Sequence, residues 1–600
     1  MPDQTYIQIL RRFFAQLSRR RRLQLAGLLV LMLFGAVAEL VTIGAVVPFI
    51  SLLARPEAAA ELPVLGELFS AIGWRDTQSL AFPMTLAFLG IVVVATFVRL
   101  VLTYASNRVI FGIGYDISVQ LYRTILDQPY SYHIERNSSE VVSAVTKAQL
   151  LLGTLLRPLM QGLTAIAVGL GILVALLIVD AATALTAGLV FGGLYFIIIS
   201  LFRNRLRTNS VTISRAQDLR VKSIQEGLGG IRDVILDASQ RHYARIFAQA
   251  DQRLRKAQAT NAFLGQGPRY VVEMFGIMLI VGLAFTLSQQ PDGLVAALPV
   301  LGALALGAVR LLPLIQQIYQ GWASFSGNFG VLEDVLGLLD LPRAAKLRQQ
   351  VERLPFESKI ELRGIRFAYA AGAPVIQDLD LVIQKGSRVG IIGQTGSGKS
   401  TLIDLIMGLL EPTGGRILVD TQLLDQANRP RWQNRISHVP QHIYLADASV
   451  AENIALGVPV DQIDHERVRH AAGLAQVADF IENHRQDYDT RVGERGVQLS
   501  GGQRQRIGIA RALYRDADVL VFDEASSALD METETAVMDA VGRLGRELTI
   551  LIIAHRVQTL RECDMIVRLE EGRIVALGSY EDVIGHDGHD DSRLARGANA

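Results

Sequence analysis

A glycine-rich run near residue 396 has the spacing of a phosphate-binding loop. Gly393-Gln-Thr-Gly-Ser-Gly-Lys399-Ser400 follows an apolar stretch, 388–392, that is typical of a strand. Gly396 and Gly398 allow consecutive backbone amides to point at phosphate oxygens, and a helix starting at Lys399 adds its positive end. We therefore expect Lys399 to neutralise the β- and γ-phosphates of a nucleotide, and Ser400 to offer a hydroxyl to Mg²⁺.

Two carboxylates follow a second apolar run, Val519-Leu-Val-Phe-Asp523-Glu524. A buried strand at 519–522 would deliver Asp523 toward Mg²⁺. It would also leave Glu524 within reach of an attacking water, as a candidate general base. Between the two elements, Leu499-Ser-Gly-Gly-Gln503 opens a helical stretch, 504–514, and its short side chains predict a second phosphate-binding surface.

The composition indicates a membrane protein. Of the 600 residues, 50% are hydrophobic and only 20% are charged, whereas an ordinary soluble domain has about 25% charged residues. The net charge of +1 provides no basic field, so nucleic acid is not an expected partner. The single cysteine, Cys563, excludes an intramolecular disulfide and a cysteine-rich metal site.

Six apolar stretches before residue 332 approach or exceed the roughly 20 residues that a helix needs to cross a bilayer. They are 23–54, 81–98, 158–179, 181–202, a fifth from about 270 to 291 and a sixth from 294 onward. The arginine run at 19–22 predicts a cytoplasmic N-terminus, and the long charged segments 104–150 and 203–268 fall on the same side. After residue 330 the sequence changes to strand-like runs typical of an α/β domain, among them 360–369, 387–392, 519–522 and 549–553. We expect a polytopic α-helical membrane domain followed by an α/β P-loop ATPase domain.

The glycine loop, the LSGGQ segment and the Asp-Glu strand, in this order, resemble an ATP-binding cassette (ABC) domain. Six spans before one cassette resemble an exporter-type ABC half-transporter. The resemblance implies an ATPase coupled to transport, with ATP and Mg²⁺ as cofactors. It divides the chain into a basic N-terminal segment (1–22), a transmembrane domain (23–330), a linker (331–355), the cassette (356–585) and a polar tail (586–600).

The same resemblance assigns roles to further residues. Tyr369 would stack on adenine, Gln441 would sense Mg²⁺ and the membrane domain, Asp530 would contact the partner cassette, and His555 would hold the γ-phosphate in catalysis with Glu524. The implied metal ligands are Ser400, Gln441 and Asp523. The implied ATP-binding residues are Tyr369, Gly393, Gln394, Thr395, Gly396, Ser397, Gly398, Lys399, Ser400, Thr401, Ser500, Gly501, Gly502, Gln503 and Asp530.

In ABC transporters the LSGGQ segment of one cassette faces the glycine loop of another, so the resemblance implies a homodimer. It also implies a multi-pass protein of the cell inner membrane with the ATPase on the cytoplasmic side. Glu524 and both glycine loops are intact, which disfavours the alternative of an ATP-gated regulator that does not pump.

Charged residues inside membrane spans are functional by default. Arg99 lies in span two, Arg269 and Glu273 open span five, and Arg310 lies within span six. Arg269 and Glu273 can pair with each other, whereas Arg310 has no nearby sequence partner and is expected to face a cavity or an anion. Arginines in two protomers would suit a phosphate or pyrophosphate head group.

The segments Pro129-Tyr-Ser-Tyr-His133 and Gly229-Gly-Ile-Arg-Asp233 are similar to those of bacterial flippases for lipid-linked oligosaccharides. They favour such a flippase, and the alternative is an exporter of a peptide, a drug or another lipid. Between spans one and two, Leu62, Leu65, Phe69 and Ile72 predict an amphipathic helix over 62–74 at the outer membrane surface. It would either cap the spans or hold the lipid tail of the cargo.

Overall fold

The protein is described by a computed structural model covering residues 6–54, 81–179, 181–288, 311–342, 352–369, 372–524, 531–542, 547–554 and 560–584. The predicted helix at 62–74, the polar tail at 586–600, and the site candidates Arg310, Asp530 and His555 lie outside these residues. The chain divides into a helical unit, Met1–Gln128 with His133–Arg343, and a second unit, Pro129–Tyr132 with Ala344–Ala600.

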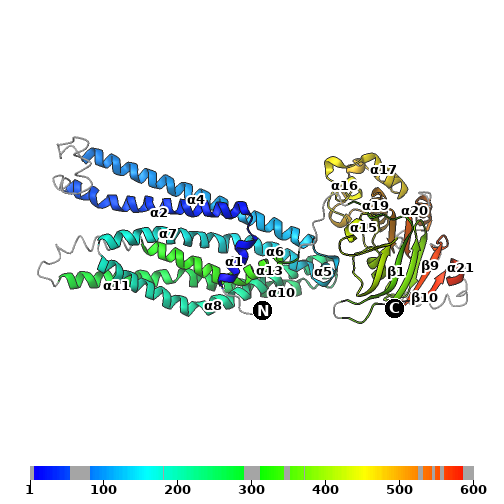
Figure 1. Ribbon diagram of the computed structural model, residues 1–600, viewed down its shortest axis with the longest axis horizontal. Helices are drawn as coiled ribbons and strands as arrows, with labels where there is room; N and C mark the ends of the chain where they lie inside the picture. Colours follow the sequence, from blue (N-terminus) through cyan, green and yellow to red (C-terminus); the bar gives the residue numbers. More distant parts are fainter. Residues whose placement is uncertain are drawn as a thin grey trace. The chain divides into compact units, whose positions relative to one another are not determined.

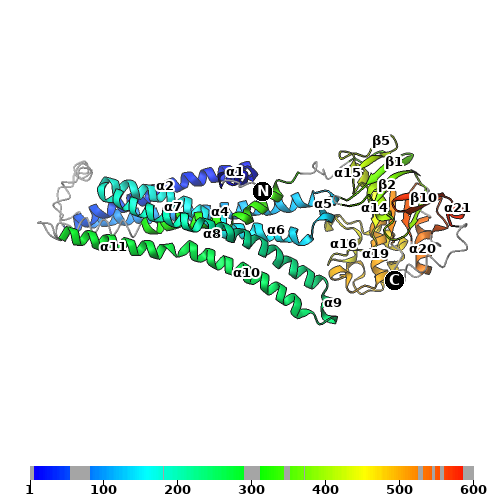
Figure 2. The same ribbon diagram turned by 90° about the horizontal axis from the view of Figure 1, so that it is seen from below.

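The helical unit consists of long helices joined by short ones (Figures 1 and 2). These are α1 (Tyr6–Gln16), α2 (Arg19–Ala54), α4 (Ala81–Leu126), α5 (Tyr130–Glu135), α6 (Ser138–Leu151), a π-helical turn (Leu152–Leu156), α7 (Arg157–Val179), α8 (Ala181–Gly229), α9 (Ile231–Leu236), α10 (Gln240–Gln266), α11 (Pro268–Ser288), a helical segment over 311–327 and α13 (Phe329–Leu339).

The first four predicted spans are helical, as α2, α4, α7 and α8. Four helical stretches of the described residues are long and apolar enough to cross a membrane: Arg19–Thr42, Thr85–Leu126, Ser138–Val174 and Gly188–Gly229. The described part of span five is α11, and that of span six is the segment 311–327. Helices α4 and α8 continue far beyond the apolar stretches that predicted them, so α8 runs beside α10 for much of its length (Figure 2).

Helix α13 belongs to the core of the helical unit. Leu332, Val335 and Leu336 on α13 are buried in a cluster with Ile117 and Leu121 of α4. The helical unit therefore includes α13, whose apolar face packs against α4.

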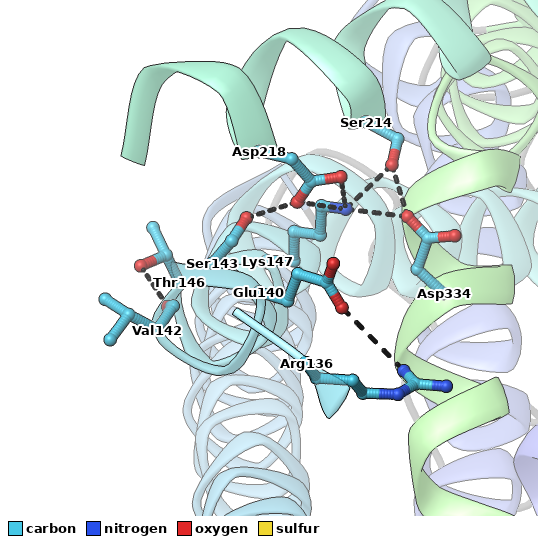
Figure 3. A network of polar contacts seen from close by, with 9 residues as sticks. All are labelled: Arg136, Glu140, Val142, Ser143, Thr146, Lys147, Ser214, Asp218 and Asp334. Atoms are coloured by element: carbon cyan, nitrogen blue, oxygen red, sulfur yellow. Dashed lines mark hydrogen bonds and ion pairs between the residues drawn. The ribbon is translucent and has the colours of Figure 1, made fainter. Parts of the chain in front are cut away.

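A buried lysine ties three helices of this unit together (Figure 3). The Nζ of Lys147, on α6, lies 2.8 Å from a carboxylate oxygen of Asp218 on α8 and 2.7 Å from Oδ2 of Asp334 on α13. Ser143 donates a hydrogen bond to Asp218, and Ser214 donates one to Asp334. Only 4% of the Lys147 side chain is exposed, so its charge depends on these two carboxylates for compensation.

The second unit contains two sheets. An antiparallel sheet has the order β2-β1-β4-β5, and a six-stranded sheet has the order β10-β9-β3-β8-β7-β6. The strands are β1 (Lys359–Phe367), β2 (Ile376–Gln384), β3 (Arg388–Gly393), β4 (Gly414–Val419), β5 (Gln422–Leu423), β6 (Ile436–Val439), β7 (Val519–Asp523), β8 (Thr549–Ile553), β9 (Met565–Glu570) and β10 (Arg573–Gly578).

The helices of this unit surround the two sheets. They are α14 (Lys399–Ile406), α15 (Arg429–Gln433), α16 (Val450–Ile454), α17 (His465–Leu474), α18 (Ala478–Glu482), α19 (Gly501–Tyr514), α20 (Met531–Gly542) and α21 (Tyr580–Ile584), with short 3₁₀ turns at Val460–Gln462, Asp487–Asp489 and Glu494–Gly496. The four strand-like runs predicted from the sequence are confirmed as β1, β3, β7 and β8.

Two apolar cores sandwich the six-stranded sheet. One contains alternate residues of the central strands, such as Ile391 and Val521, together with Leu402 and Trp432. The other contains Ile552 with apolar residues of α17 and α19. Cys563 lies in this second core, and burial raises the pKa of its thiol to about 12.

We expect Lys147→Met to destabilise the helical unit, because it keeps the aliphatic chain but leaves Asp218 and Asp334 facing each other without a cation. Hydrogen bonds to charged groups suggest a loss of about 2 kcal/mol. The measurement is the thermal unfolding midpoint of the detergent-purified protein. Lys222→Met is the matched control, because Lys222 forms only an exposed pair with Glu226 at 3.6 Å on the same helix. An unchanged midpoint for Lys147→Met would contradict the prediction.

Candidate functional site

The parallel register of the six-stranded sheet brings the two main sequence motifs together. In this register β8 pairs with both β3 and β7, so that Ile553 lies opposite Ile391 on one side and Asp523 on the other. The carboxyl ends of parallel strands lie at the same edge of a sheet. The glycine loop after β3 and the carboxylates at the end of β7 therefore share one edge, only one strand apart.

The glycine loop has the backbone conformation that its sequence requires. Gly396 and Gly398 have φ of 84° and 101°, a region that favours glycine. A Cβ on Gly398 would lie 2.8 Å from Cδ1 of Ile376 on β2, so space also restricts this position. Helix α14 begins at Lys399, as predicted, and its first turn presents the exposed Ser400 and the buried Thr401. Gln394 and Thr395 are exposed in the loop itself.

Lys399 is folded back over its own loop. Its Nζ donates hydrogen bonds to the carbonyl oxygens of Gly393, at 2.8 Å, and Gln394, at 3.0 Å. Burial lowers the pKa of Lys399, while the nearby Glu524 and Asp523 oppose that shift. Burial likewise raises the pKa of Asp523, reinforced by Glu524 and opposed by Lys399. Burial therefore disfavours the charged form of each group by more than their mutual attraction favours it, so the charges of Lys399 and Asp523 are incompletely compensated.

This charge deficit fits a nucleotide with a divalent cation. Phosphates supply negative charge near Lys399, and a cation supplies positive charge near Asp523. Ser397 Oγ is buried without a hydrogen-bond partner in the described part of the chain, so it can accept a further contact. The described residues include no group of three His, Cys, Asp or Glu side chains that could hold a metal alone. A cation held by Asp523 and Ser400 would need phosphate oxygens to complete its shell.

Glu524 and Gln441 meet beside this edge. Gln441 Nε2 donates a 2.6 Å hydrogen bond to Glu524 Oε2. Glu524 has φ of 48°, which is unusual for a residue with a side chain. Its backbone N–H donates to the carbonyl of Ile553 at the end of β8. The sequence placed Gln441 and Glu524 in the same site through a family resemblance, and the structure brings their side chains into direct contact.

Tyr369 lies beside the helix that follows the glycine loop. Its hydroxyl is 3.3 Å from Oγ1 of Thr401, and its ring packs edge-on against Phe367 with centroids 4.9 Å apart. Tyr369 is 37% exposed, so part of this residue remains accessible near the end of β1.

The LSGGQ segment forms a capped helix start. Ser500 Oγ accepts a hydrogen bond from the Gln503 N–H, and the Gln503 side chain accepts one from the Ser500 N–H. This capping box starts α19 at Gly501, three residues before the predicted start. Ser500 and Gly501 are exposed. Within the described residues, no hydrogen bond joins 499–503 to the glycine loop at 393–401.

Residues 376–527 match the family described as ABC transporter, and residues 61–294 match the ABC transporter transmembrane region. An ATP-dependent lipid A-core flippase of Methylococcus capsulatus is 30% identical over 568 residues, covering 92% of this chain and 90% of the relative. The chain belongs to the ABC transporter family. With one membrane region and one cassette it is an exporter-type half-transporter, and its cassette makes it an ATPase coupled to transport.

Two further comparisons agree with this membership. The β-(1→2)glucan export ATP-binding/permease protein NdvA of Rhizobium meliloti is 29% identical to the transporter, covering 88% of this chain and 90% of the relative. The solved structure of a bacterial Atm1-family ABC exporter with ATP bound superposes with a TM-score of 0.75 at 22% identity, covering 96% of this chain and 98% of the other. The fold predicted from the sequence is confirmed.

The charged membrane residues of the transporter are paired where they are described. Arg99 forms an ion pair with Glu39, which is only 6% exposed. Arg269 pairs with Glu273 at 2.6 Å one turn along α11, which confirms the pairing that the sequence suggested. The partner of Arg99 was missed, although each residue is the single charge in one of two consecutive apolar stretches that pack as α2 and α4 (Figure 1).

Asp404 is a second residue that sequence reasoning missed. It is the only charge in the apolar run that follows Thr401, and it lies on α14, behind the glycine loop. Burial, with a contribution from Asp523, raises its pKa to about 6. An acid with a raised pKa costs stability once it ionises, so the native transporter loses stability as the pH rises from about 4 to about 6.

We therefore expect Asp404→Asn to stabilise the cassette at pH 7.5 but not at pH 4.5. After allowance for partial exposure, the gain at pH 7.5 is roughly 1 kcal/mol. The measurement is the difference in thermal unfolding midpoint between variant and parent at the two pH values. Asp461→Asn, in an exposed turn, serves as control. A variant that is less stable than the parent at pH 7.5 would contradict the assignment.

Proposed function

We propose that the protein is a homodimeric flippase of the bacterial inner membrane that moves an anionic, lipid-linked oligosaccharide outward with energy from ATP. The observation that carries the ATP-driven part is the shared sheet edge of Lys399, Asp523 and Glu524 on a chain with membrane-spanning helices. The cassettes and the N-terminus would lie in the cytoplasm, consistent with the arginine run at 19–22.

At each ATP site the glycine loop, residues 393–398, would wrap the phosphates and Tyr369 would stack on the base. Lys399 would leave its loop carbonyls and neutralise the β- and γ-phosphates, which removes the unfavourable burial of its charge. Asp523 and Ser400 would hold Mg²⁺, with Gln441 near the same shell. The cation would supply charge neutralisation at the transferred phosphoryl group.

Glu524 is proposed as the general base that accepts a proton from the attacking water. Its 2.6 Å hydrogen bond from Gln441 fixes the carboxylate, and its position after Asp523 keeps it next to the metal ligand. His555 would contact the γ-phosphate. It follows β8, the strand that separates β3 from β7 in the sheet.

A second copy of the chain is proposed to complete each site. The exposed start of α19 at Ser500 and Gly501 has no hydrogen bond to the glycine loop of its own chain within the described residues, yet it offers free backbone amides at a helix N-terminus. Two-fold symmetry places two such starts against two glycine loops and gives two identical sites. Asp530 would lie at this contact.

The cargo is proposed from charge and from relatives. Arg310 within span six would bind the phosphate or pyrophosphate of the lipid, whereas Arg99 and Arg269 already have carboxylate partners and contribute less. The names of two relatives refer to a glucan and to the lipid A core, both of which contain saccharide. They favour a saccharide cargo and support, as the second candidate, export of a glucan or of another glycolipid.

We expect Glu524→Gln to bind ATP normally but to hydrolyse it at least about 10²-fold more slowly, because the attacking water loses its base. The measurements are nucleotide binding and phosphate release by the purified transporter in nanodiscs. Glu547→Gln, an exposed change before β8 in the same cassette, is the matched control and should leave both unchanged. Hydrolysis at the parental rate by Glu524→Gln would place the base elsewhere.

We expect Arg310→Ala to abolish stimulation of ATPase by a lipid-pyrophosphate saccharide while basal ATPase persists, because the head group loses its cation. Arg205→Ala, an exposed change on the extension of α8, is the control. Flipping in liposomes is compared for a lipid-pyrophosphate saccharide, a glycolipid without phosphate and a cationic amphiphile. Equal stimulation of Arg310→Ala and parent by the lipid-pyrophosphate would reject the anionic cargo without affecting the ATPase assignment.

A further inference from the structure

An apolar cavity of about 620 Å³ lies beside the first helix of the chain. Its walls include Ile7, Leu10 and Phe14 of α1, Leu28 and Met32 of α2, and Leu163 of α7. The contributing part of α2 is the first third of a predicted span, directly after the arginine run. The cavity therefore lies at the depth where acyl chains of the cytoplasmic leaflet begin.

Helix α1 is fixed by the face that does not line the cavity. Ile9 is fully buried, the ring of Tyr6 packs on Phe325 and Phe329, and the guanidinium of Arg12 binds Asp340 at the end of α13. The opposite face carries Ile7, Leu10 and Phe14, which are 38% to 61% exposed. This second face is thus held in place but left uncovered.

Arg11 lies on this uncovered face of α1, because it directly follows Leu10 and comes one turn before Phe14. It is the one charged residue on that face. It lines the cavity, and no described residue forms an ion pair or hydrogen bond with it. Arg22, the other cavity-lining arginine, is instead occupied: it donates to the carbonyl oxygens of Leu17 and Ala15 at the end of α1. The cavity thus has an apolar interior and two arginines, of which Arg11 has its hydrogen-bond donors unused among the described residues.

We propose that this cavity binds an anionic membrane phospholipid, with an acyl chain against Leu10 and Phe14 and the phosphate on Arg11. A guanidinium binds phosphate oxygens in a bidentate manner, and the lipid covers the exposed face of α1. Charge complementarity selects an anionic lipid over a zwitterionic one. The cavity is lined only by residues between Ile7 and Leu163, none of which belongs to the ATP site, so lipid binding there does not depend on which cargo is transported.

The test is native mass spectrometry of the intact, detergent-purified transporter titrated with dioleoyl phosphatidylglycerol or dioleoyl phosphatidylcholine. We expect tighter binding of phosphatidylglycerol. Arg11→Gln should weaken its binding at least about fivefold, which corresponds to the loss of one charge near the membrane surface. Ala15→Trp places a large side chain at the exposed rim of the cavity and should weaken the binding of both lipids.

Arg20→Gln is the matched control. Arg20 has the same charge and lies in the nearby arginine run at 19–22, but it does not line the cavity. Equal weakening by Arg20→Gln and Arg11→Gln would show diffuse surface attraction and overturn the proposal. Equal binding of the two lipids by the parent would overturn the role of Arg11, and binding that survives Ala15→Trp would place the lipid outside this cavity.

Discussion

The in-register pairing of β3, β8 and β7 is the constraint on which the rest of the cassette depends. It sets one ammonium and two carboxylates at the same edge of a buried sheet, where burial disfavours the charged forms of Lys399 and Asp523. Nucleotide phosphates bound near Lys399 would favour its charged form, which would add to the direct contacts of a bound nucleotide.

The helical unit also buries charged side chains, but other side chains of the same unit carry the opposite charges. Its buried charges are compensated internally: Glu39 by Arg99 inside the spans, and Lys147 by Asp218 and Asp334 on the extensions of the helices. Each pair joins elements that are distant in sequence. These ion pairs also favour the observed neighbours among the helices. A packing that separated the partners would leave a charged side chain buried without a counter-charge.

The amino-acid sequence predicts the cassette better than the membrane charges. The positions of Lys399, Asp523 and Glu524 follow from local rules, because a glycine loop after a strand and an apolar strand before two carboxylates each have one common structural context. The partners of Arg99 and Lys147 do not follow from local rules, since they come from other helices. The packing of α13 does not follow from local rules either, because it depends on the apolar surface of α4.

Burial of Cys563 has a consequence for how motion in this protein can be followed. The thiol is the only one in the chain, it lies in a packed core, and its pKa of about 12 keeps it protonated at neutral pH. Thiolate is the reactive form, so Cys563 is expected to react slowly with maleimide and nitroxide labels. A cysteine introduced on an exposed position such as Gly501 would become the sole labelled site, and in a two-fold dimer each label would report its distance from its own symmetry mate.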